Sequence, residues 1–214
     1  MMEYDLDFLI GFDGSLKPSQ INLSSLVNVT EKHVSQHRYY YQSSLNEESE
    51  LIIEFKNTNL PHLLNLSSRH HCNLPTYTAT EIFQRIKGDW DLDYLIAADE
   101  QWFSESQDKL IGVLFLYQIF HIQECKVYTP NKIINSVHGS RFKRDNIYFV
   151  IFKSANGKVY SVELSETESS NVYTPKSMKI NDSHLDKCSE IEMTFIRAER
   201  IRPPRKRKNK KTRK

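Results

Sequence analysis

Apolar side chains recur every three or four residues through the middle of the chain, which is the period of a helix with one buried face. The segment 105–121 shows this period most clearly and predicts the strongest helix. Shorter helices are predicted at 92–96, after Pro61, where proline suits a first turn, and, from a weaker pattern, within 19–35. The apolar stripe of the strongest helix consists of Leu110, Val113, Leu114, Tyr117 and Phe120.

A further helix is predicted from the chemistry of its two ends. Thr78 and Glu81 form a capping box, in which each side chain can accept a hydrogen bond from the backbone N–H of the other residue. Apolar residues at helical spacing follow, and Gly88 provides the C-terminal stop. The helix is therefore expected to run from about residue 78 to residue 87.

Other segments have the composition of strands. Near the start, 37–42 and 51–55 are rich in aromatic and β-branched residues and flank a polar loop, which predicts a hairpin. Because these strands, the helices and a second set of strands follow one another in separate runs, the pattern predicts an α+β fold. The strands expected beyond the helices are 125–129, 147–152, 158–164, 171–180 and 190–198.

The two faces of one predicted hairpin differ in polarity. Asn156 and Gly157 suit a two-residue turn, which would pair Ile151 with Val162. The face that contains Ile151 is mostly apolar and is expected to pack against the helices. The opposite face, which contains Ser161, is more polar and is a candidate substrate surface.

Composition limits the class of protein without naming a function. The chain has 214 residues, of which 39% are hydrophobic and 26% charged, which is typical of one globular domain with a tail. No apolar run is long enough to span a bilayer, and the acidic N-terminus lacks the basic start of a signal peptide. These features predict a cytoplasmic protein that does not act at a membrane.

The sequence lacks the motifs of several classes of cofactor-binding and metal-binding protein. The three cysteines form no CxxC pair, which argues against a zinc knuckle or a redox site. Neither glycine-rich nucleotide motif, GxGxxG or GxxxxGK[ST], is present. His70-His71-Cys72 has no second ligand pair at zinc spacing, and the aspartates between 89 and 99 lack the pattern of a calcium loop. No cofactor and no metal site is predicted.

Positive charge is concentrated at the C-terminal end. Residues 202–214 contain nine basic residues and no acidic one. Since the whole chain has a formal net charge of +2, residues 1–201 carry about −7. Like-charge repulsion predicts a disordered tail, and basic arms of this kind bind the phosphates of nucleic acids with a steep salt dependence. The alternative, that the tail only keeps the chain soluble, stays open.

Candidate phosphate-binding residues occur in this tail and in the basic loop between two predicted strands. The loop residues have a second interpretation as ordinary solvated side chains. The tail residues bind any polyanion and do not indicate a particular chemistry. The candidates are Arg205, Lys206, Arg207 and Lys208 in the tail, and Lys132, Arg141, Lys143 and Arg144 in the loop.

A set of segments, in this order along the chain, resembles a bacterial and phage protein family. This is the fourth subfamily of the phage barnase–EndoU–colicin–RelE-like nucleases, and the resemblance covers roughly residues 35–200. Asn65 stands where that family usually has glycine. The segments that carry the resemblance are EFKNTNLPHLLNL (54–66), TEIFQRIKG (80–88), KLIGVLFLYQIF (109–120), KVYTPNKI (126–133), IYFVIF (147–152), KVYSVEL (158–164) and NVYTPKSM (171–178).

The resemblance implies a metal-independent endoribonuclease of the kind found in phage, mobile genetic elements and toxin systems. The implied fold has an N-terminal hairpin and helices packed on an antiparallel, roughly four-stranded sheet. This divides the chain into a weakly patterned segment 1–34, a nuclease-like domain 35–201 and the basic tail 202–214. The implied partners are RNA and, for a toxin, a protein inhibitor such as an antitoxin or immunity protein. The alternative is a non-catalytic RNA-binding or interaction protein that retains the fold.

Catalysis without a metal requires a base for the 2′-hydroxyl, an acid for the 5′-oxygen and cations for the phosphate. Among eight histidines, His62 is favoured because it lies in the PHLL segment that carries the resemblance. Tyr148, Lys153, Tyr160 and Ser161 are further candidates, since a tyrosine can donate a proton and a lysine can hold a phosphate. Each has a structural alternative: His62 can cap or pack a helix, and the others can be ordinary residues of a sheet.

Overall fold

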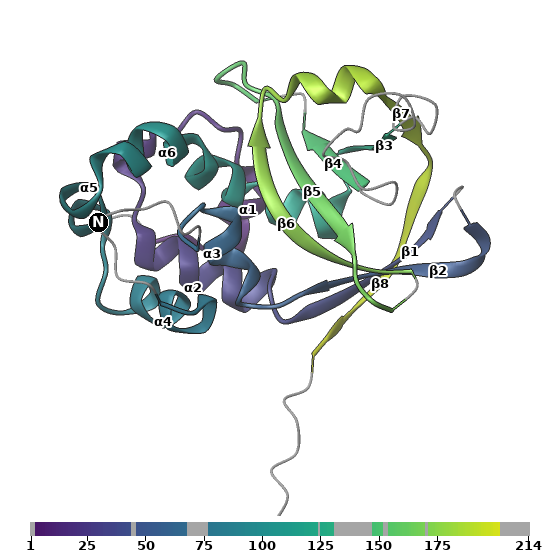
Figure 1. Cartoon of the computed structure of the whole chain (residues 1–214), viewed down its shortest axis with the longest axis horizontal. Helices are drawn as coiled ribbons and strands as arrows, with labels where there is room; N and C mark the ends of the chain where they lie inside the picture. Colours follow the sequence, from purple (N-terminus) through teal and green to yellow (C-terminus); the bar gives the residue numbers. More distant parts are fainter. Residues whose placement is uncertain are drawn as a thin grey trace, which may run out of the picture.

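A group of helices packs against one curled sheet in the computed structural model (Figure 1). The general α+β class predicted from the sequence is confirmed. The structure describes residues 3–43, 46–67, 77–123, 125–130, 147–151, 154–169 and 171–201, with the backbone alone for 46–49. None of the helices in these segments has the length and apolar character needed to cross a bilayer.

The elements follow the chain in the order helices, hairpin, helices and strands. The helices are α1 (Leu6–Gly11), η1 (Pro18–Gln20), α2 (Leu23–His33), α3 (Asn59–Leu63), α4 (Ala79–Lys87), α5 (Leu92–Ala98), α6 (Glu100–Leu114), the π-helix η2 (Gln118–Ile122) and η3 (Ser183–Lys187). The strands are β1 (His37–Ser43), β2 (Asn46–Phe55), β3 (Lys126–Pro130), β4 (Ile147–Ile151), β5 (Tyr160–Glu166), β6 (Val172–Ile180), β7 (Cys188–Ile191) and β8 (Met193–Arg200).

The expectation of a four-stranded antiparallel sheet is wrong. The sheet has eight strands in the order β7-β3-β4-β5-β6-β2-β1-β8 and curls into a half-barrel (Figure 1). It is mixed, because β2 pairs with β6 in parallel while the other described pairs are antiparallel. The N-terminal hairpin, which was expected to pack on the sheet, is therefore two strands of the sheet itself.

The last predicted strand is in fact two strands at opposite edges of the sheet. β7 pairs with β3, whereas β8 pairs with β1. Only Glu192 separates them, so the chain passes from one edge to the other within one residue, which requires a curled sheet. The side chain of Gln123 holds β8 from the inside: it donates to the carbonyl of Met193 and accepts from the N–H of Phe195 at 2.9 Å.

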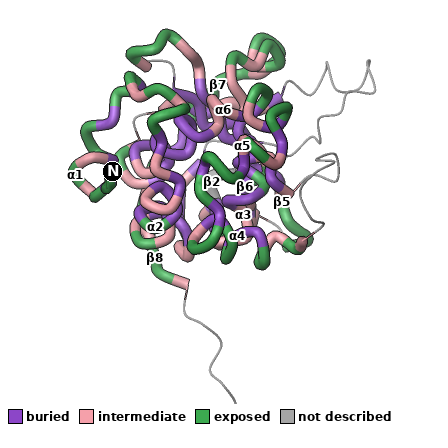
Figure 2. Tube along the Cα trace, turned by 90° about the vertical axis from the view of Figure 1, so that its left-hand side faces the viewer, coloured by how far each residue is buried: buried purple, intermediate pink, exposed green. Residues whose placement is uncertain are grey.

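The core fills the inside of this curl, between the sheet and the helices. Tyr41 and Phe149 belong to strands that are not neighbours, yet their ring centroids lie 5.5 Å apart. Phe120 of η2 lies 5.6 Å from Phe149, so the segment that follows α6 enters the half-barrel. Gly112 lets α6 approach β6, since a Cβ atom there would lie 2.7 Å from the sulfur of Met178. Figure 2 shows the buried residues gathered at the centre of the molecule.

The β4–β5 hairpin has the predicted faces but a different register. Ile151 pairs with Tyr160 and not with Val162. The turn at 154–157 lies outside the ladder, where its backbone donates a hydrogen bond of 2.7 Å to the carbonyl of Asp13. Because the register differs by two residues, the alternation of side chains is preserved. Ile151 and Val162 therefore still face the core.

The helix ends confirm one boundary and revise another. Thr78 and Glu81 form the predicted capping box, with N···O distances of 3.3 and 2.8 Å. The long helix begins earlier than predicted, because the carboxylate of Asp99 accepts a hydrogen bond from the N–H of Trp102 at 2.9 Å and caps it. Regular helix α6 ends at Leu114, and η2 follows. The aspartate before α6 is thus a helix cap.

Candidate functional site

The structure does not bring the sequence-predicted catalytic residues together. His62 is exposed on α3, which packs against β6. Tyr160 belongs to the hydrophobic core. Tyr148 and Ser161 point to the opposite face of the sheet, because side chains alternate along a strand and their neighbours belong to the core. Lys153 lies outside the described residues.

His62 lies in the last turn of α3, directly before a sharp turn at Asn65. Its Nδ1 atom contacts the hydroxyl of Ser67. Asn65 has a φ of +59°, in the left-handed region where the resembled family usually has glycine. The N–H of Leu66 donates to the carbonyl of Pro61 at 2.8 Å, which closes the turn. Asparagine thus forms the turn that glycine would form, since it tolerates this conformation.

The polar face of the β4–β5 hairpin is buried at its centre. Tyr148 and Ser161 are each 1% exposed, and Glu163 is 6% exposed. The carboxylate of Glu163 pairs with Lys176 Nζ at 3.2 Å. Within the described part of the chain, the hydroxyl of Ser161 has no hydrogen-bond partner. Ser161 therefore makes no hydrogen bond to an acid or a base among the described residues, although Lys179 is its partner in the β5–β6 ladder.

Substitution of this serine tests whether its hydroxyl is truly unpaired. We expect Ser161→Ala to leave the free energy of unfolding unchanged or to raise it by about 1 kcal/mol, because an unpaired buried hydroxyl carries a desolvation cost. The matched control is Ser106→Ala. The Ser106 hydroxyl is equally buried but accepts a hydrogen bond from Asn65 Nδ2 at 3.2 Å, so its loss should cost about 1 kcal/mol. Equal destabilisation by both variants in urea denaturation would show that Ser161 has a partner.

The predicted nucleic-acid-binding residues are not covered by the described segments. Their contribution to RNA binding stays a prediction from their charge. The His70-His71-Cys72 segment also lies outside the described residues. In the segments that the structure describes, no group of three His, Cys, Asp or Glu side chains could hold a metal ion. The predicted nucleic-acid-binding residues that lie outside the described segments are Lys132, Arg141, Lys143, Arg144, Arg205, Lys206, Arg207 and Lys208.

Three other histidines meet at one end of the half-barrel. His33 is the last residue of α2, His37 is the first residue of β1, and His121 lies on η2. The rings of His37 and His121 have centroids 5.8 Å apart and are nearly perpendicular. Tyr117 stacks on His121 at 4.5 Å, and its ring lies 6.5 Å from that of His33. We call these four residues the histidine cluster; all four side chains are partly exposed.

Two unusual backbone conformations place the histidine cluster. Gln36 has a φ of +59°, which turns the chain from α2 into β1 directly before His37. Gln123 has a φ of +61° and ends the π-helix that presents His121. Left-handed backbone is uncommon outside glycine, and π-helical turns are frequent at functional sites. The local backbone thus differs from regular structure on both sides of the cluster.

Hydrogen bonds to backbone carbonyl groups fix the tautomers of the neutral His121 and His37 rings. His121 Nε2 lies 2.9 Å from the carbonyl oxygen of His33 and 3.1 Å from the hydroxyl of Tyr39. A carbonyl can only accept, so this nitrogen carries the hydrogen and the lone pair of neutral His121 lies on Nδ1. In His37 the nitrogen Nδ1 lies 2.8 Å from the carbonyl oxygen of Ser35, so Nδ1 carries the hydrogen and the lone pair of the neutral ring lies on Nε2.

Burial keeps one ring of the cluster neutral. Desolvation lowers the pKa of His121 to about 4, and the nearby rings of His37 and His33 add to this effect when they are charged. Burial and the charge of Lys32 also lower the pKa of His33. At neutral pH, His121 is therefore an uncharged imidazole with its lone pair on Nδ1, beside the ring of His37. Such a pair can accept a proton at one ring and donate a proton from the other.

The sequence gives little sign of the histidine cluster. His37 and His121 lie 84 positions apart (121 − 37), and no motif joins them. One local sign is that His37 is the first residue of an aromatic-rich strand and His121 lies at the end of an apolar helical segment, and both elements face one core. The description of the histidine cluster therefore rests on its geometry, without support from a related protein. No protein-family model, no curated protein and no solved structure matches this chain.

Proposed function

We propose that the protein is a metal-independent endoribonuclease in which His37 and His121 are the acid–base pair. The observation that carries this proposal is the pairing of the two imidazoles at 5.8 Å, with His121 held neutral and its lone pair on Nδ1. RNA cleavage by the neighbouring 2′-hydroxyl requires one base and one acid. The resemblance of the sequence to a nuclease family supports the same function, although it pointed to His62.

The tautomers assign a role to each ring. Nδ1 of His121 removes the proton of the 2′-hydroxyl, whose oxygen then bonds to the adjacent phosphorus. The bond from phosphorus to the 5′-oxygen breaks, and the protonated Nε2 of His37 donates its proton to that oxygen. The products are a 2′,3′-cyclic phosphate and a 5′-hydroxyl. A bound phosphodiester anion favours the charged form of an imidazole, so it strengthens His121 as a base when substrate is present.

The point at which the basic segment leaves the described fold supports RNA as the substrate. The N–H of Ile201, the last described residue, donates a hydrogen bond of 2.7 Å to the carbonyl of Gln36. Gln36 directly precedes His37, so the nine basic residues of 202–214 follow a point beside the histidine cluster. The attachment of this positive charge directly after Ile201 favours a polyanionic substrate for the cluster.

Cleavage of RNA in EDTA tests the proposed function. We expect the purified protein to cut single-stranded RNA in the presence of EDTA and to leave 2′,3′-cyclic phosphate ends. An all-deoxy strand of the same sequence should bind but stay intact, because it lacks the nucleophile. A gel shift without cleavage would contradict the proposal and would favour the second candidate function, RNA binding without catalysis, which the nine basic residues alone support.

A further inference from the structure

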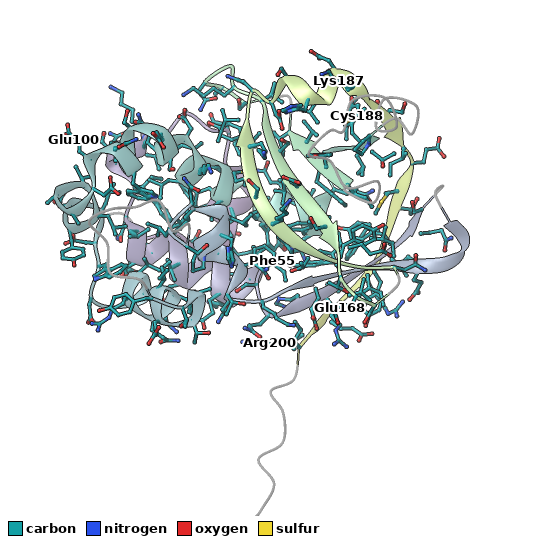
Figure 3. The ribbon with its side chains drawn as sticks, viewed as in Figure 1. Phe55, Glu100, Glu168, Lys187, Cys188 and Arg200 are labelled. Carbon is teal, nitrogen blue, oxygen red and sulfur yellow. The ribbon has the colours of Figure 1, made fainter. Side chains whose placement is uncertain are left out.

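Arg200 lies beside His37 on the same face of the sheet. The two residues are directly opposite in the ladder between β1 and β8. The neighbouring pair, Gln36 and Ile201, is joined by a backbone hydrogen bond of 2.7 Å, so His37 and Arg200 form a pair of the type without hydrogen bonds. Side chains in such a pair are closest, with Cβ atoms roughly 4.5–5.5 Å apart. Figure 3 labels Arg200 at the end of β8, at the same end of the sheet as Phe55.

Two other arginines at this edge of the sheet are neutralised by carboxylates. Arg197 pairs with Glu50 at 2.6 Å and with Glu199 at 3.0 Å. Arg38 pairs with Glu54 at 2.8 Å. These pairs lie on the outer face of the sheet, because their positions alternate with those that face the core.

Arg200 differs from both. Its side chain is exposed, and no hydrogen bond or ion pair joins it to the residues that the structure describes. Lys32, in the last turn of α2, is also exposed, and its charge acts on His33. The end of the sheet that holds the histidine cluster therefore has an arginine that none of the described carboxylates neutralises.

We propose that Arg200 holds the phosphate of a phosphodiester between itself, His37 and His121; its role in cleavage rests on the proposed function. A guanidinium group donates two parallel hydrogen bonds to phosphate oxygens, a geometry that lysine does not reproduce. Negative charge grows on these oxygens as the 2′-oxygen bonds to phosphorus, so a cation at this place stabilises the transition state. The hydrogen bond between Ile201 and Gln36 fixes the strand end that carries Arg200.

Binding of inorganic phosphate tests the site without any need for catalysis. Phosphate is titrated into the full-length protein, and the imidazole C–H resonances of His37 and His121 are followed by NMR. We expect both resonances to shift in the wild type and the affinity to fall about tenfold in Arg200→Gln. Arg200→Lys should lie between the two, because it keeps the charge but loses the paired donors.

Arg197→Gln is the matched control. It removes the same group from the same strand, but on the outer face and from an existing ion pair. This variant should bind phosphate within about twofold of the wild type, and the melting temperature of Arg200→Gln should equal that of the wild type because the side chain is exposed. Equal loss of affinity in both variants, or none in Arg200→Gln, would overturn the proposed phosphate site.

RNA cleavage separates this inference from the proposed function. In EDTA, Arg200→Gln should lower kcat by about 10²-fold with a smaller change in KM, as expected for a donor that acts mainly on the transition state. If the wild type binds phosphate through Arg200 but cuts no RNA, the endoribonuclease proposal fails and the phosphate site stands. If the wild type cuts RNA and Arg200→Gln cuts equally fast, the phosphate site fails and the endoribonuclease proposal stands.

Discussion

His37→Gln and His121→Gln are each expected to lower the rate of RNA cleavage by about 10²–10⁴-fold, the usual contribution of one general acid or base. Glutamine retains polarity and approximate size but cannot change its protonation state near neutral pH. Both side chains are partly exposed, so the variants should fold. Single-turnover cleavage in EDTA measures the effect, and a gel shift with an all-deoxy strand shows whether binding is retained.

The double variant distinguishes an acid–base pair from two independent sites. If His37 and His121 act in one reaction, the double variant should be little slower than either single variant, because residues that act as a unit are strongly non-additive. His33→Gln is the control within the cluster, since His33 contacts His121 through its backbone carbonyl, which the substitution keeps. We expect this variant to cleave RNA at close to the wild-type rate.

His62→Gln compares the two hypotheses for the catalytic histidine. The sequence favoured His62, which is exposed on α3 and contacts Ser67. If cleavage depends on the pair in the histidine cluster, His62→Gln should leave the rate near that of the wild type. A loss of 10²-fold or more in His62→Gln, with normal rates in the two cluster variants, would instead place catalysis in the PHLL segment and make the cluster structural.

Most element positions were predictable because their causes are local. The capping box at Thr78 and Glu81 acts within four residues, and the apolar period of α6 is present in the sequence itself. The arrangement of strands was not predictable in the same way. A strand with one apolar face fits any neighbour with a matching face, so nothing local selects β6 as the parallel partner of β2. The change of edge at Glu192 depends on the curl of the whole sheet.

The candidate site was missed for a related reason. Its two imidazoles meet only after the sheet has curled and η2 has entered it, and the left-handed conformation of Gln36 and Gln123 has no glycine to reveal it. The basic segment was predictable from the sequence, because its positive charge does not depend on how the chain folds. The sequence also favoured a histidine as the catalytic residue, but a motif of adjacent residues led to His62 instead of to the pair.

Acidification is expected to reduce the free energy of unfolding by about 2 kcal/mol between pH 6.5 and pH 4, because of His121, whose partial exposure screens part of the effect of its lowered pKa. Its pKa is lowered from an ordinary value of 6.5 to about 4 by burial. Between these values the unfolded chain binds a proton that the folded chain does not, so stability is fully present above pH 6.5 and is lost as the pH falls. Each pKa unit corresponds to about 1.36 kcal/mol. His33, whose pKa burial also lowers, acts in the same direction.

Urea denaturation at a series of pH values measures this loss, and His121→Phe is the variant that isolates it. Phenylalanine keeps a ring beside Tyr117 and Tyr39 but cannot bind a proton. The variant should be less stable than the wild type at pH 7, because the bond to the carbonyl of His33 is lost, and its stability should change less between pH 6.5 and pH 5. This window lies above the range in which paired carboxylates such as Glu50 and Glu81, whose pKa values are lowered, take up protons. An equally steep loss in His121→Phe would show that His121 does not govern the acid sensitivity, and the neutral imidazole assigned as the base would lose its physical support.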